Sequence, residues 1–423
     1  MPKITHVWSR EILDSRGIPT METALQLDDG NSAVASVPSG ASTGSFEAHE
    51  LRDGDVKRYL GKGVLKAVAN VTTVIGPKIV GLEVANQTAL DKTLIDLDGT
   101  ANKEKLGANA ILSVSLAVLR AASSSQRYPL YAWVAALAQQ FGIPPVRLKV
   151  PTPIFNMING GLHGAGNLDF QEFFIIPSSA VIYSRALQIG AEIYHKIKDS
   201  LARRGAIHSV GDEGGYAPNL FTNLDALSIL VEASRESGFN VGNDLFLGLD
   251  VAANNFYRDG KYSIRDRSAP LDRDSFLTFY NNLNDQYHLA IMEDPLFEDD
   301  WEGWSRITAN FAGKALIVGD DLLVTNPARV ERGIKEKAAN AILVKPNQIG
   351  TVSETLQVIK MSREAGWKII VSHRSGETND TSIADFAVGI GADYVKFGAP
   401  ARGERVAKYN RLLAIETELA AKK

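Results

Sequence analysis

Apolar runs in the second half of the chain repeatedly end in an ionisable side chain. In residues 340–350, NAILVKPNQIG, four apolar residues lead directly into Lys345, and Pro346 ends the run. A lone charge at a strand end is normally solvated, because acids and lysines are seldom buried without a partner. The repetition at successive runs instead indicates one site, whose candidate members are Asp250, Glu293, Asp320, Lys345, His373 and Lys396, with Glu172 and Glu213 near further junctions.

Three of these residues, Asp250, Glu293 and Asp320, are carboxylates that suit a divalent cation. Held together without a counter-charge, they would repel one another and raise their own pKa values. The chain contains no cysteine and no HExxH helix, so all-oxygen ligation favours Mg²⁺ over zinc. The alternative is a ring of salt bridges to Lys345 and Lys396, but both lysines suit other chemical roles.

Lys345 is a candidate general base. A lysine can accept a proton only when its amine is neutral, so its pKa must fall from the usual value of about 10.4. Positive charge on Mg²⁺ and Lys396, together with partial burial, would lower that pKa. We therefore expect a lowered pKa for Lys345 and a role in proton abstraction.

Two glycine-rich segments, residues 38–45 (PSGASTGS) and 159–167 (NGGLHGAGN), could approach an anion closely or act as lids. Neither is a Walker loop, because no Gly-Lys-Ser/Thr follows, and an ordinary turn is the alternative.

Arg374 and Ser375 follow a buried run and suit phosphate oxygens, although a structural arginine would look the same. His163 could equally be a packed histidine.

The composition excludes several classes of protein. With 45% hydrophobic residues, 22% charged residues and a net charge of −4, the chain gives no reason to expect nucleic acid or an anionic membrane as its main partner. The lack of cysteine fits a reducing cytoplasm, and the charged N-terminus is unlike a signal peptide. Arg120 interrupts an apolar helix, and no segment is long enough to span a membrane. We expect a cytoplasmic protein.

The elements that position these residues fall into two predicted domains, because 423 residues are too many for one core. Residues 1–140 read as an α+β cap, with strands at 3–13, 20–27 and 32–37 and helices at 64–80, 88–97 and 108–122. The proline-rich segment 141–153 marks a boundary. Residues 141–423 then alternate apolar runs with helical segments, the runs including 173–177, 245–250, 289–294, 315–321, 341–346, 368–373 and 393–398.

This alternation predicts an α/β fold with an eight-stranded, TIM-like β/α barrel. In such a barrel the carboxyl ends of the strands converge on one mouth, which would bring the candidate residues together. An open doubly wound sheet is the alternative, but it normally carries a glycine-rich first turn, and none is placed that way.

Read in order, the motifs resemble those of the enolase (phosphopyruvate hydratase) family. The similar segments span residues 13 to 410 and include LDSRGIPT, VPSGASTGSFEA, VGDEGGYAP, EDPLFEDDW, LVKPNQIGT, VSHRSGET and KFGAPARGERVAKYN. Any one segment could match by chance, but the ordered set is highly specific. The resemblance implies a barrel with irregular early strands, one of them antiparallel. It also implies the reversible dehydration of 2-phosphoglycerate to phosphoenolpyruvate in glycolysis and gluconeogenesis.

The resemblance also implies a role for each matching position. Asp250, Glu293 and Asp320 match the ligands of the tighter of two Mg²⁺ ions, and Ser39 matches a loop ligand of the second, substrate-dependent ion. Lys345 matches the base and Glu213 the general acid. The other matches lie at substrate or active-site contacts: Glu172, Gln171, His163, His373, Lys396, Arg374 and Ser375.

Four positions depart from the family pattern. Phe397 stands where the family usually has Ser or Thr, Gly164 to Gly166 alter the loop after His163, Ser113 replaces Gly, and His49 replaces Leu. None removes a chemical role, but Phe397 could change the polarity of the pocket.

The family is usually dimeric or a ring of dimers, which implies a homo-oligomer. Two rival interpretations stay open. One is a relative that acts on a different acid, although such relatives lack the SGASTG and HRSGET segments. The other is a weakly active or silent binding or scaffold protein, with the terminal AAKK as a lysine tag.

Overall fold

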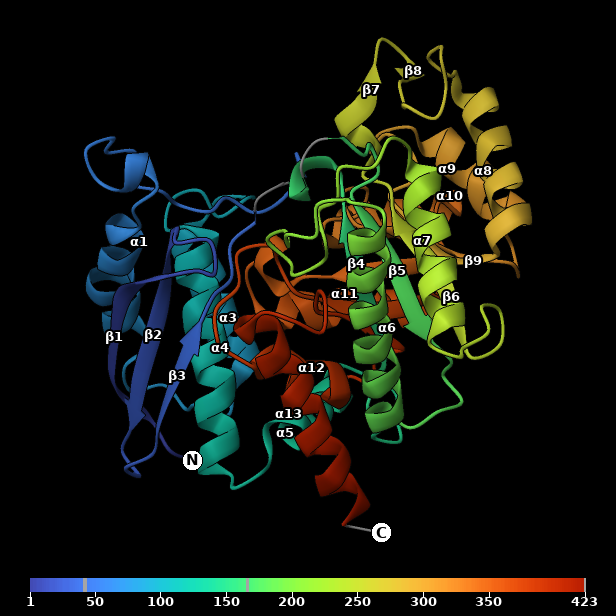
Figure 1. Ribbon diagram of the computed structural model, residues 1–423. Coiled ribbons are helices and arrows are strands. Elements are labelled where there is room, and N and C mark those ends of the chain that lie inside the picture. Colours follow the sequence, from blue (N-terminus) through green and yellow to red (C-terminus); the bar gives the residue numbers. More distant parts are fainter. Residues whose placement is uncertain (41–43, 165–166, 422–423) are drawn as a thin grey trace.

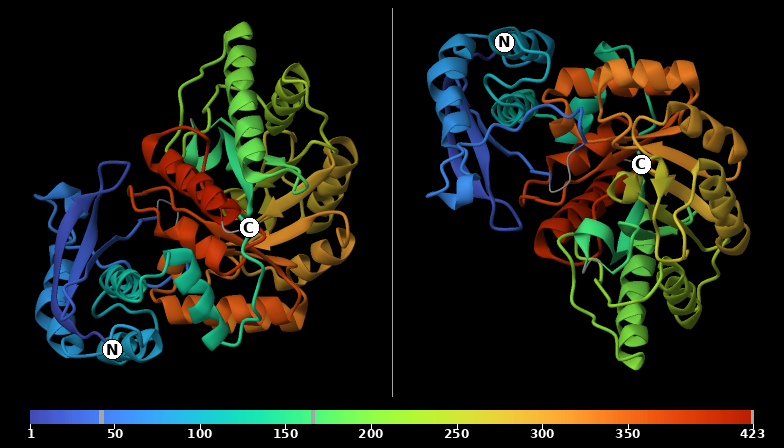
Figure 2. Two further views of the ribbon diagram at one scale, coloured as in Figure 1. Left: turned by 90° about the horizontal axis from the view of Figure 1, so that it is seen from below. Right: turned by 90° about the horizontal axis from the view of Figure 1, so that it is seen from above.

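The computed structural model in Figure 1 describes residues 1–40, 44–164 and 167–421. Parts of both predicted lid loops, residues 41–43 and 165–166, and the terminal Lys422 and Lys423 lie outside the described residues. A small N-terminal sheet with its helices lies beside a larger closed barrel, as the two views of Figure 2 show. The expected fold class is therefore confirmed.

The N-terminal sheet is an antiparallel meander in the order β1-β2-β3. Gly30, with φ of 86°, supplies the left-handed turn between β2 and β3. The sheet packs against the buried helix α4, which lies alongside it in Figure 1. The elements of this part are β1 (Ile4–Leu13), β2 (Pro19–Leu27), β3 (Ser32–Ser36), η1 (Tyr59–Gly61), α1 (Leu65–Asn70), η2 (Val71–Ile75), α2 (Gly76–Ile79), α3 (Gln87–Asp98), α4 (Ala108–Ser125) and α5 (Leu130–Gln140).

The helix predicted over residues 64–80 is interrupted. A π-helical turn, η2, separates α1 from α2, and Pro77 follows it in the first turn of α2. Proline has no N–H to donate and its ring crowds the preceding turn, so the regular hydrogen-bond ladder cannot continue through this point.

The barrel closes in the order β10-β11-β12-β13-β4-β5-β6-β9. Strand β5 runs antiparallel to both neighbours, and the other barrel pairs are parallel. One antiparallel early strand is what the sequence resemblance implied. The barrel strands are β4 (Thr152–Asn159), β5 (Glu172–Pro177), β6 (Leu245–Asp250), β9 (Leu289–Glu293), β10 (Leu316–Gly319), β11 (Ala341–Val344), β12 (Lys368–Ser372) and β13 (Tyr394–Lys396).

Helices surround the barrel, and most begin at a residue that can cap them. Thr222 and Asp225 form a capping box on α7, and Asn326 caps α10, whose first residue is Pro327. The helices are α6 (Tyr183–Arg203), α7 (Asn223–Glu236), α8 (Arg273–Tyr287), α9 (Trp301–Asn310), α10 (Pro327–Glu336), α11 (Val352–Glu364), α12 (Ser382–Gly389) and α13 (Gly403–Ala420). Short elements complete the barrel half: η3 (Gly161–His163), η4 (Ala253–Phe256), β7 (Tyr257–Arg258), β8 (Lys261–Tyr262) and η5 (Pro346–Gln348).

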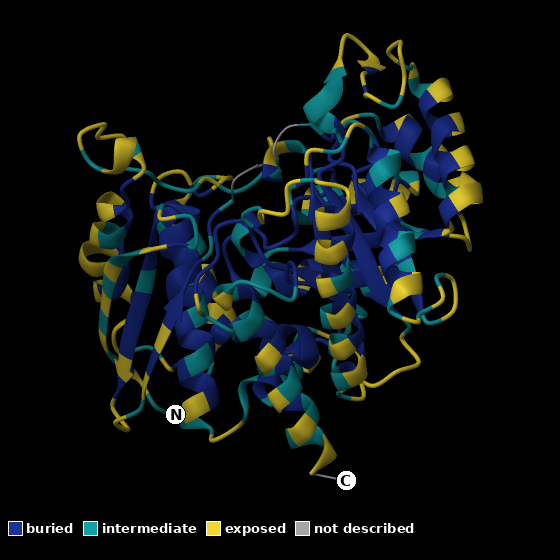
Figure 3. Cartoon of the chain, in the orientation of Figure 1, coloured by how far each residue is buried: buried dark blue, intermediate teal, exposed yellow. Residues whose placement is uncertain are grey.

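The interior of the barrel is an apolar cluster of its own, and the buried strands are dark blue in Figure 3. In β11, Ala341 and Leu343 belong to this inner cluster, whereas Ile342 and Val344 pack outward in the main core. Successive side chains of a strand point to opposite faces. The next inward position after Leu343 is therefore Lys345, at the carboxyl end of the strand.

Polar contacts join the N-terminal helices to the barrel. The buried Asp91 of α3 accepts hydrogen bonds from the Ser353 N–H (2.9 Å) and Oγ–H (2.6 Å), and so caps α11 from outside that helix. Ser115 of α4 accepts from the Val352 N–H (3.0 Å). These bonds fix the helix that follows the Lys345 strand. Among the described residues, we find no helix that combines the length and the apolar character needed to span a membrane.

Candidate active site

A polar pocket at the carboxyl end of the barrel gathers the predicted residues. Its lining contains every predicted site residue except Ser39 and Glu293, and Glu293 reaches the same cluster through a contact with Lys396. The lining residues are His163, Gln171, Glu172, Glu213, Asp250, Ala252, Asn255, Asp294, Asp320, Asp321, Lys345, Ser372, His373, Arg374, Ser375 and Lys396.

Strand periodicity explains why these side chains meet. Glu293 lies two residues beyond the inward-facing Ile291, and Asp320 lies two beyond Val318. Glu172 is the first residue of its strand, not the last. It still lies at the mouth because β5 is reversed, and it pairs in register with Asp250.

Lys396 lies between the carboxylates of the first wall. Its Nζ is 3.1 Å from Asp250 Oδ2, 2.8 Å from Glu293 Oε1 and 3.2 Å from Glu172 Oε2. Burial disfavours the charged ammonium, but these carboxylates outweigh that effect and raise the pKa of Lys396. Burial and the neighbouring Asp250 raise the pKa of Glu293. Lys396 is therefore held protonated.

The residues of this wall fit a bound cation. Carboxyl groups outnumber cationic groups here, and Asp250 Oδ1 is buried without a hydrogen-bond partner among the described residues. Two sets of ligand atoms converge within 4.8 Å of one another, Asp294 with Asp320 and Asp321, and His163 with Glu172 and Glu213. Of the three predicted ligands, Asp320 is the one that belongs to either of these sets. Asp250 and Glu293 instead both contact the ammonium group of Lys396. The assignment of Asp250, Glu293 and Asp320 as ligands stays a prediction.

Lys345 forms a largely buried ion pair with Asp320 Oδ2. Burial lowers the pKa of the amine, but Asp320 more than offsets this, and the net pKa of Lys345 is raised. The lowered pKa that we expected for Lys345 beside Mg²⁺ stays a prediction. Gln348 holds the same carboxylate from its other side, because its Nε2 donates to Asp320 Oδ1 at 2.8 Å.

Next to this group, Glu172 and a second acid, Glu213, lie beside two histidines. His373 Nε2 is 3.0 Å from Glu213 Oε2, and His163 Nδ1 is 3.0 Å from Glu172 Oε1. Burial works to raise the pKa of Glu213, but the two histidines lower it well below its usual range. Burial and the charge of Glu213 raise the pKa of Glu172 to about 7. A proton shared by this pair therefore resides on Glu172.

Arg374 and Ser375 lie side by side at the edge of the pocket. The buried Arg374 guanidinium donates to Glu47 Oε2 (2.8 Å) and Oε1 (3.1 Å). Ser375 Oγ is 3.4 Å from His163 Nε2. A bidentate arginine and a neighbouring hydroxyl are suited to a phosphate.

Ser39 does not face this pocket in the structure. Its hydroxyl donates to Glu50 Oε2 (3.1 Å) and accepts from Arg52 Nη2 (2.8 Å). Its backbone forms a pair of hydrogen bonds with Gly376, beside the Arg374–Ser375 pair. The role of Ser39 as a metal ligand stays a prediction.

Phe397, Ser113, His49 and Gly164, the departures that the structure describes, are absent from the pocket lining. Phe397 is buried and packs against Tyr409 at a ring-centroid distance of 6.1 Å. Ser113 Oγ is 2.6 Å from Thr23 Oγ1 and links α4 to the N-terminal sheet, and His49 is exposed. Phe397 therefore adds no aromatic surface to the pocket, while Ala165 and Gly166 lie outside the described residues.

Sequence reasoning missed three residues that hold the site together. Asp294 accepts the backbone N–H groups of Asp320 (3.0 Å) and Asp321 (2.8 Å). Gln348 orients Asp320, and the fully buried Arg405 contacts His373. The helical spacing of the sequence could have indicated that Arg405 is buried. It lies on the same face of α13 as the buried Tyr409, Leu412 and Ile415.

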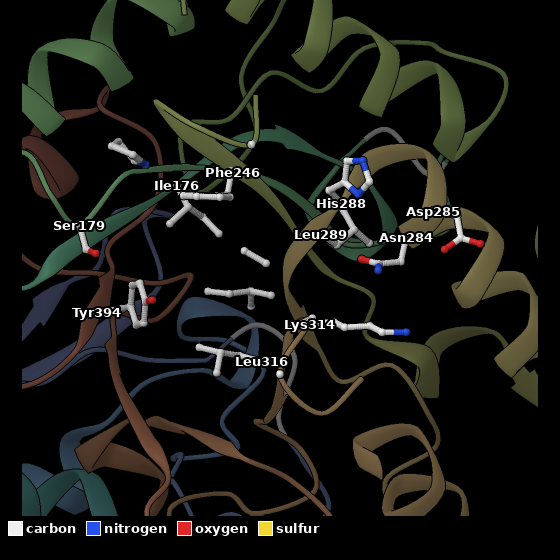
Figure 4. Close-up of a pocket in the computed structure, with 16 residues that line it drawn as sticks. Ile176, Ser179, Phe246, Asn284, Asp285, His288, Leu289, Lys314, Leu316 and Tyr394 are labelled. Carbon is white, nitrogen blue, oxygen red and sulfur yellow. The ribbon is translucent and has the colours of Figure 1, made fainter. Parts of the chain in front are cut away.

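A larger cavity lies elsewhere. It has a volume of about 750 Å³ and opens at the amino ends of β9 and β10, at the far end of the barrel. Figure 4 shows its apolar wall, with Ile176, Phe246 and Leu316, and its polar rim, with Asn284 and Lys314. It shares no lining residue with the polar pocket.

A closed barrel with converging acids and lysines at its carboxyl mouth defines the class of β/α-barrel enzymes. Comparison with known families narrows this class. Residues 4–134 match the family model described as enolase, N-terminal domain, and residues 147–423 match that described as enolase, C-terminal TIM barrel domain. The chain therefore belongs to the enolase family, whose members are lyase-type enzymes that typically bind Mg²⁺.

Proposed function

We propose that this protein catalyses the reversible, Mg²⁺-dependent dehydration of 2-phosphoglycerate to phosphoenolpyruvate. One observation carries the proposal. A largely buried lysine, Lys345, and a pair of neighbouring acids, Glu172 with Glu213, line the same pocket. Removal of the C2 proton needs a base and departure of hydroxide needs an acid, and this pocket holds candidates for both.

The first half of the proposed reaction is proton abstraction. The C2 hydrogen of the substrate lies next to a carboxylate, so its removal adds negative charge to that group. Lys396 is held protonated by its three carboxylate neighbours, and it can stabilise this charge as it develops. Because Lys396 serves this role, we assign removal of the C2 proton to the other lysine of the pocket, Lys345.

Mg²⁺ bound by Asp250, Glu293 and Asp320 would supply further positive charge for the substrate carboxylate. Asp320 is the group that most strongly raises the pKa of Lys345, followed by Glu293. Lys345 therefore becomes a base once Asp320 has another partner. This dependence reconciles a raised pKa in the structure with a basic role in the reaction.

The second half is loss of the C3 hydroxyl. Hydroxide is a poor leaving group, so it must receive a proton as it departs. The Glu172–Glu213 pair holds one, because the pKa of Glu172 is about 7. We propose that Glu213 delivers this proton to the substrate and that Glu172 replenishes it, with His163 beside both.

The Arg374–Ser375 pair selects a phosphorylated substrate in this proposal. The guanidinium must exchange Glu47 for phosphate oxygens, and a dianionic phosphate is the stronger partner. Glycerate lacks the phosphate and should not be turned over. This expectation separates the proposed activity from that of a relative that acts on another acid.

The test is the rise in ultraviolet absorbance as the product double bond forms. We expect a rise with 2-phosphoglycerate and Mg²⁺, none with glycerate, and none after chelation of the metal. Turnover of glycerate at a comparable rate would overturn the assignment of substrate. No turnover of either compound by the folded, Mg²⁺-loaded protein would favour a binding role.

A further inference from the structure

Arg405 lies entirely inside the protein, behind the wall that carries His373. It has no exposed surface, and its guanidinium donates to four acceptors. Nη1 donates to His373 Nδ1 (2.7 Å) and to the Arg374 carbonyl oxygen (2.6 Å). Nη2 donates to the carbonyl oxygens of Asp212 (3.0 Å) and Ser375 (2.5 Å). One side chain therefore ties together the backbone before Glu213 and the Arg374–Ser375 pair.

The contact with His373 fixes where the imidazole carries its proton. A guanidinium has only N–H donors and keeps its charge in proteins. The ring nitrogen that faces it, Nδ1, must therefore accept with a lone pair. A neutral ring then carries its proton on Nε2, which lies 3.0 Å from the carboxylate oxygen of Glu213.

We propose that Arg405 is a positioning residue that locks His373 as the neutral Nε2–H tautomer, so that His373 donates a hydrogen bond to Glu213. This donor orients the Glu213 carboxylate while leaving it free of a full ion pair. The tautomer is a property of the protein alone. Its effect on catalysis rests on the dehydration proposed above.

Loss of the guanidinium would remove this control. The charged groups around the ring are Glu213, Arg405 and Glu377. Burial lowers the pKa of His373 to about 4, Glu213 opposes that effect and Arg405 assists it. Without Arg405, Glu213 still lies 3.0 Å from Nε2, and the guanidinium that faced Nδ1 is gone. His373 then takes up a second proton and pairs with Glu213 as an imidazolium.

Histidine NMR tests the structural half directly. The full-length protein, labelled with ¹⁵N at its 7 histidine rings, is compared with His373→Gln to assign the His373 signals. We expect the wild type to show a protonated Nε2 and an unprotonated Nδ1 at pH 7. Arg405→Met should shift the ring to the doubly protonated form, and Arg405→Lys should retain the wild-type pattern, because an ammonium also only donates.

A matched control separates this effect from the general loss of a buried cation. Lys408 lies one turn further along α13, is equally buried, and pairs with Glu377 (2.8 Å) and the Thr378 carbonyl oxygen (3.0 Å). Lys408→Met should leave the His373 signals unchanged. A protonated Nδ1 in the wild type, or an unchanged pattern in Arg405→Met, would overturn the proposal. The wild-type spectrum decides the matter even if Arg405→Met does not fold.

Kinetics tests the catalytic half. Exchange of the C2 hydrogen requires Lys345, whereas dehydration also requires Glu213. We expect Arg405→Met to slow dehydration roughly tenfold more than C2 exchange, the loss expected for one charge-assisted hydrogen bond. Equal loss of both would refute the catalytic role. If the wild type does not turn over 2-phosphoglycerate, the proposed function is wrong. The NMR experiment still tests the tautomer of His373, because that test does not depend on turnover.

Discussion

Replacement of Lys345 by alanine tests the central claim about the reaction. Among the described residues, the other lysine and the two histidines of the pocket already have partners. Lys396 is held protonated by Asp250, Glu293 and Glu172. The two histidines contact carboxylates, His163 that of Glu172 and His373 that of Glu213. Lys345→Ala should therefore abolish exchange of the C2 hydrogen of 2-phosphoglycerate with solvent.

The size of the loss follows from what a positioned base contributes. General base catalysis supplies roughly 10²–10⁴-fold, which corresponds to about 3–5 kcal/mol in the activation barrier. Asp320 stays hydrogen-bonded to Gln348 (2.8 Å) after the substitution, so its side chain keeps one partner. We expect the full loss to appear in the rate of exchange, with little change in substrate affinity.

The assay follows uptake of deuterium at C2 by NMR or mass spectrometry, in D₂O with Mg²⁺. Lys314→Ala is a suitable control, because it removes an exposed lysine at the opposite end of the barrel. It should exchange at the wild-type rate. Exchange by Lys345→Ala at an undiminished rate would mean that the base is a different group.

Four further predictions concern the rest of the site and the contact between its two parts. Glu213→Gln should stop dehydration but retain some C2 exchange, measured in the same samples; equal loss of both would count against separate acid and base roles. Arg374→Met should raise KM for 2-phosphoglycerate by at least about tenfold in steady-state assays, because a bidentate charged contact is lost. Mg²⁺ should raise the melting temperature of the wild type by mass action and do so less for Asp250→Asn. Finally, burial raises the pKa of Asp91 to about 6, above its ordinary 3.8, so the folded state binds this proton more tightly than the unfolded state. Stability should fall by about 2 kcal/mol between pH 4 and pH 6 through this group, out of a total of about 3 kcal/mol, and Asp91→Asn should remove that part of the pH dependence in denaturant titrations.

Much of the barrel could be predicted from the sequence because its strands are short, apolar and bounded by charges. Residues 341–346 illustrate this, since four buried residues lead to Lys345. Strand β4 was missed because it begins inside the proline-rich segment. Pro153 argues against a strand, although an apolar run follows it. The domain boundary at residue 141 stays a prediction.

The candidate site was predicted as a set of residues but not as a set of contacts. Strand-end positions show which side chains share a mouth, and they do not show which of them pair. For this reason the choice of Asp320 as the partner that raises the pKa of Lys345 was not predicted. Arg405 was missed because a charged residue in a helix is normally assigned to solvent.

The reversed direction of β5 has a consequence for how this site can change. Parallel neighbours must be joined by a long crossover, but β4 and β5 form a hairpin whose connection begins and ends at the mouth, where Asn159 pairs with Glu172. Residues can be added to or removed from that connection without moving a crossover helix on the outside of the barrel. New substrate preferences can therefore arise in this hairpin while the remaining strands keep their register.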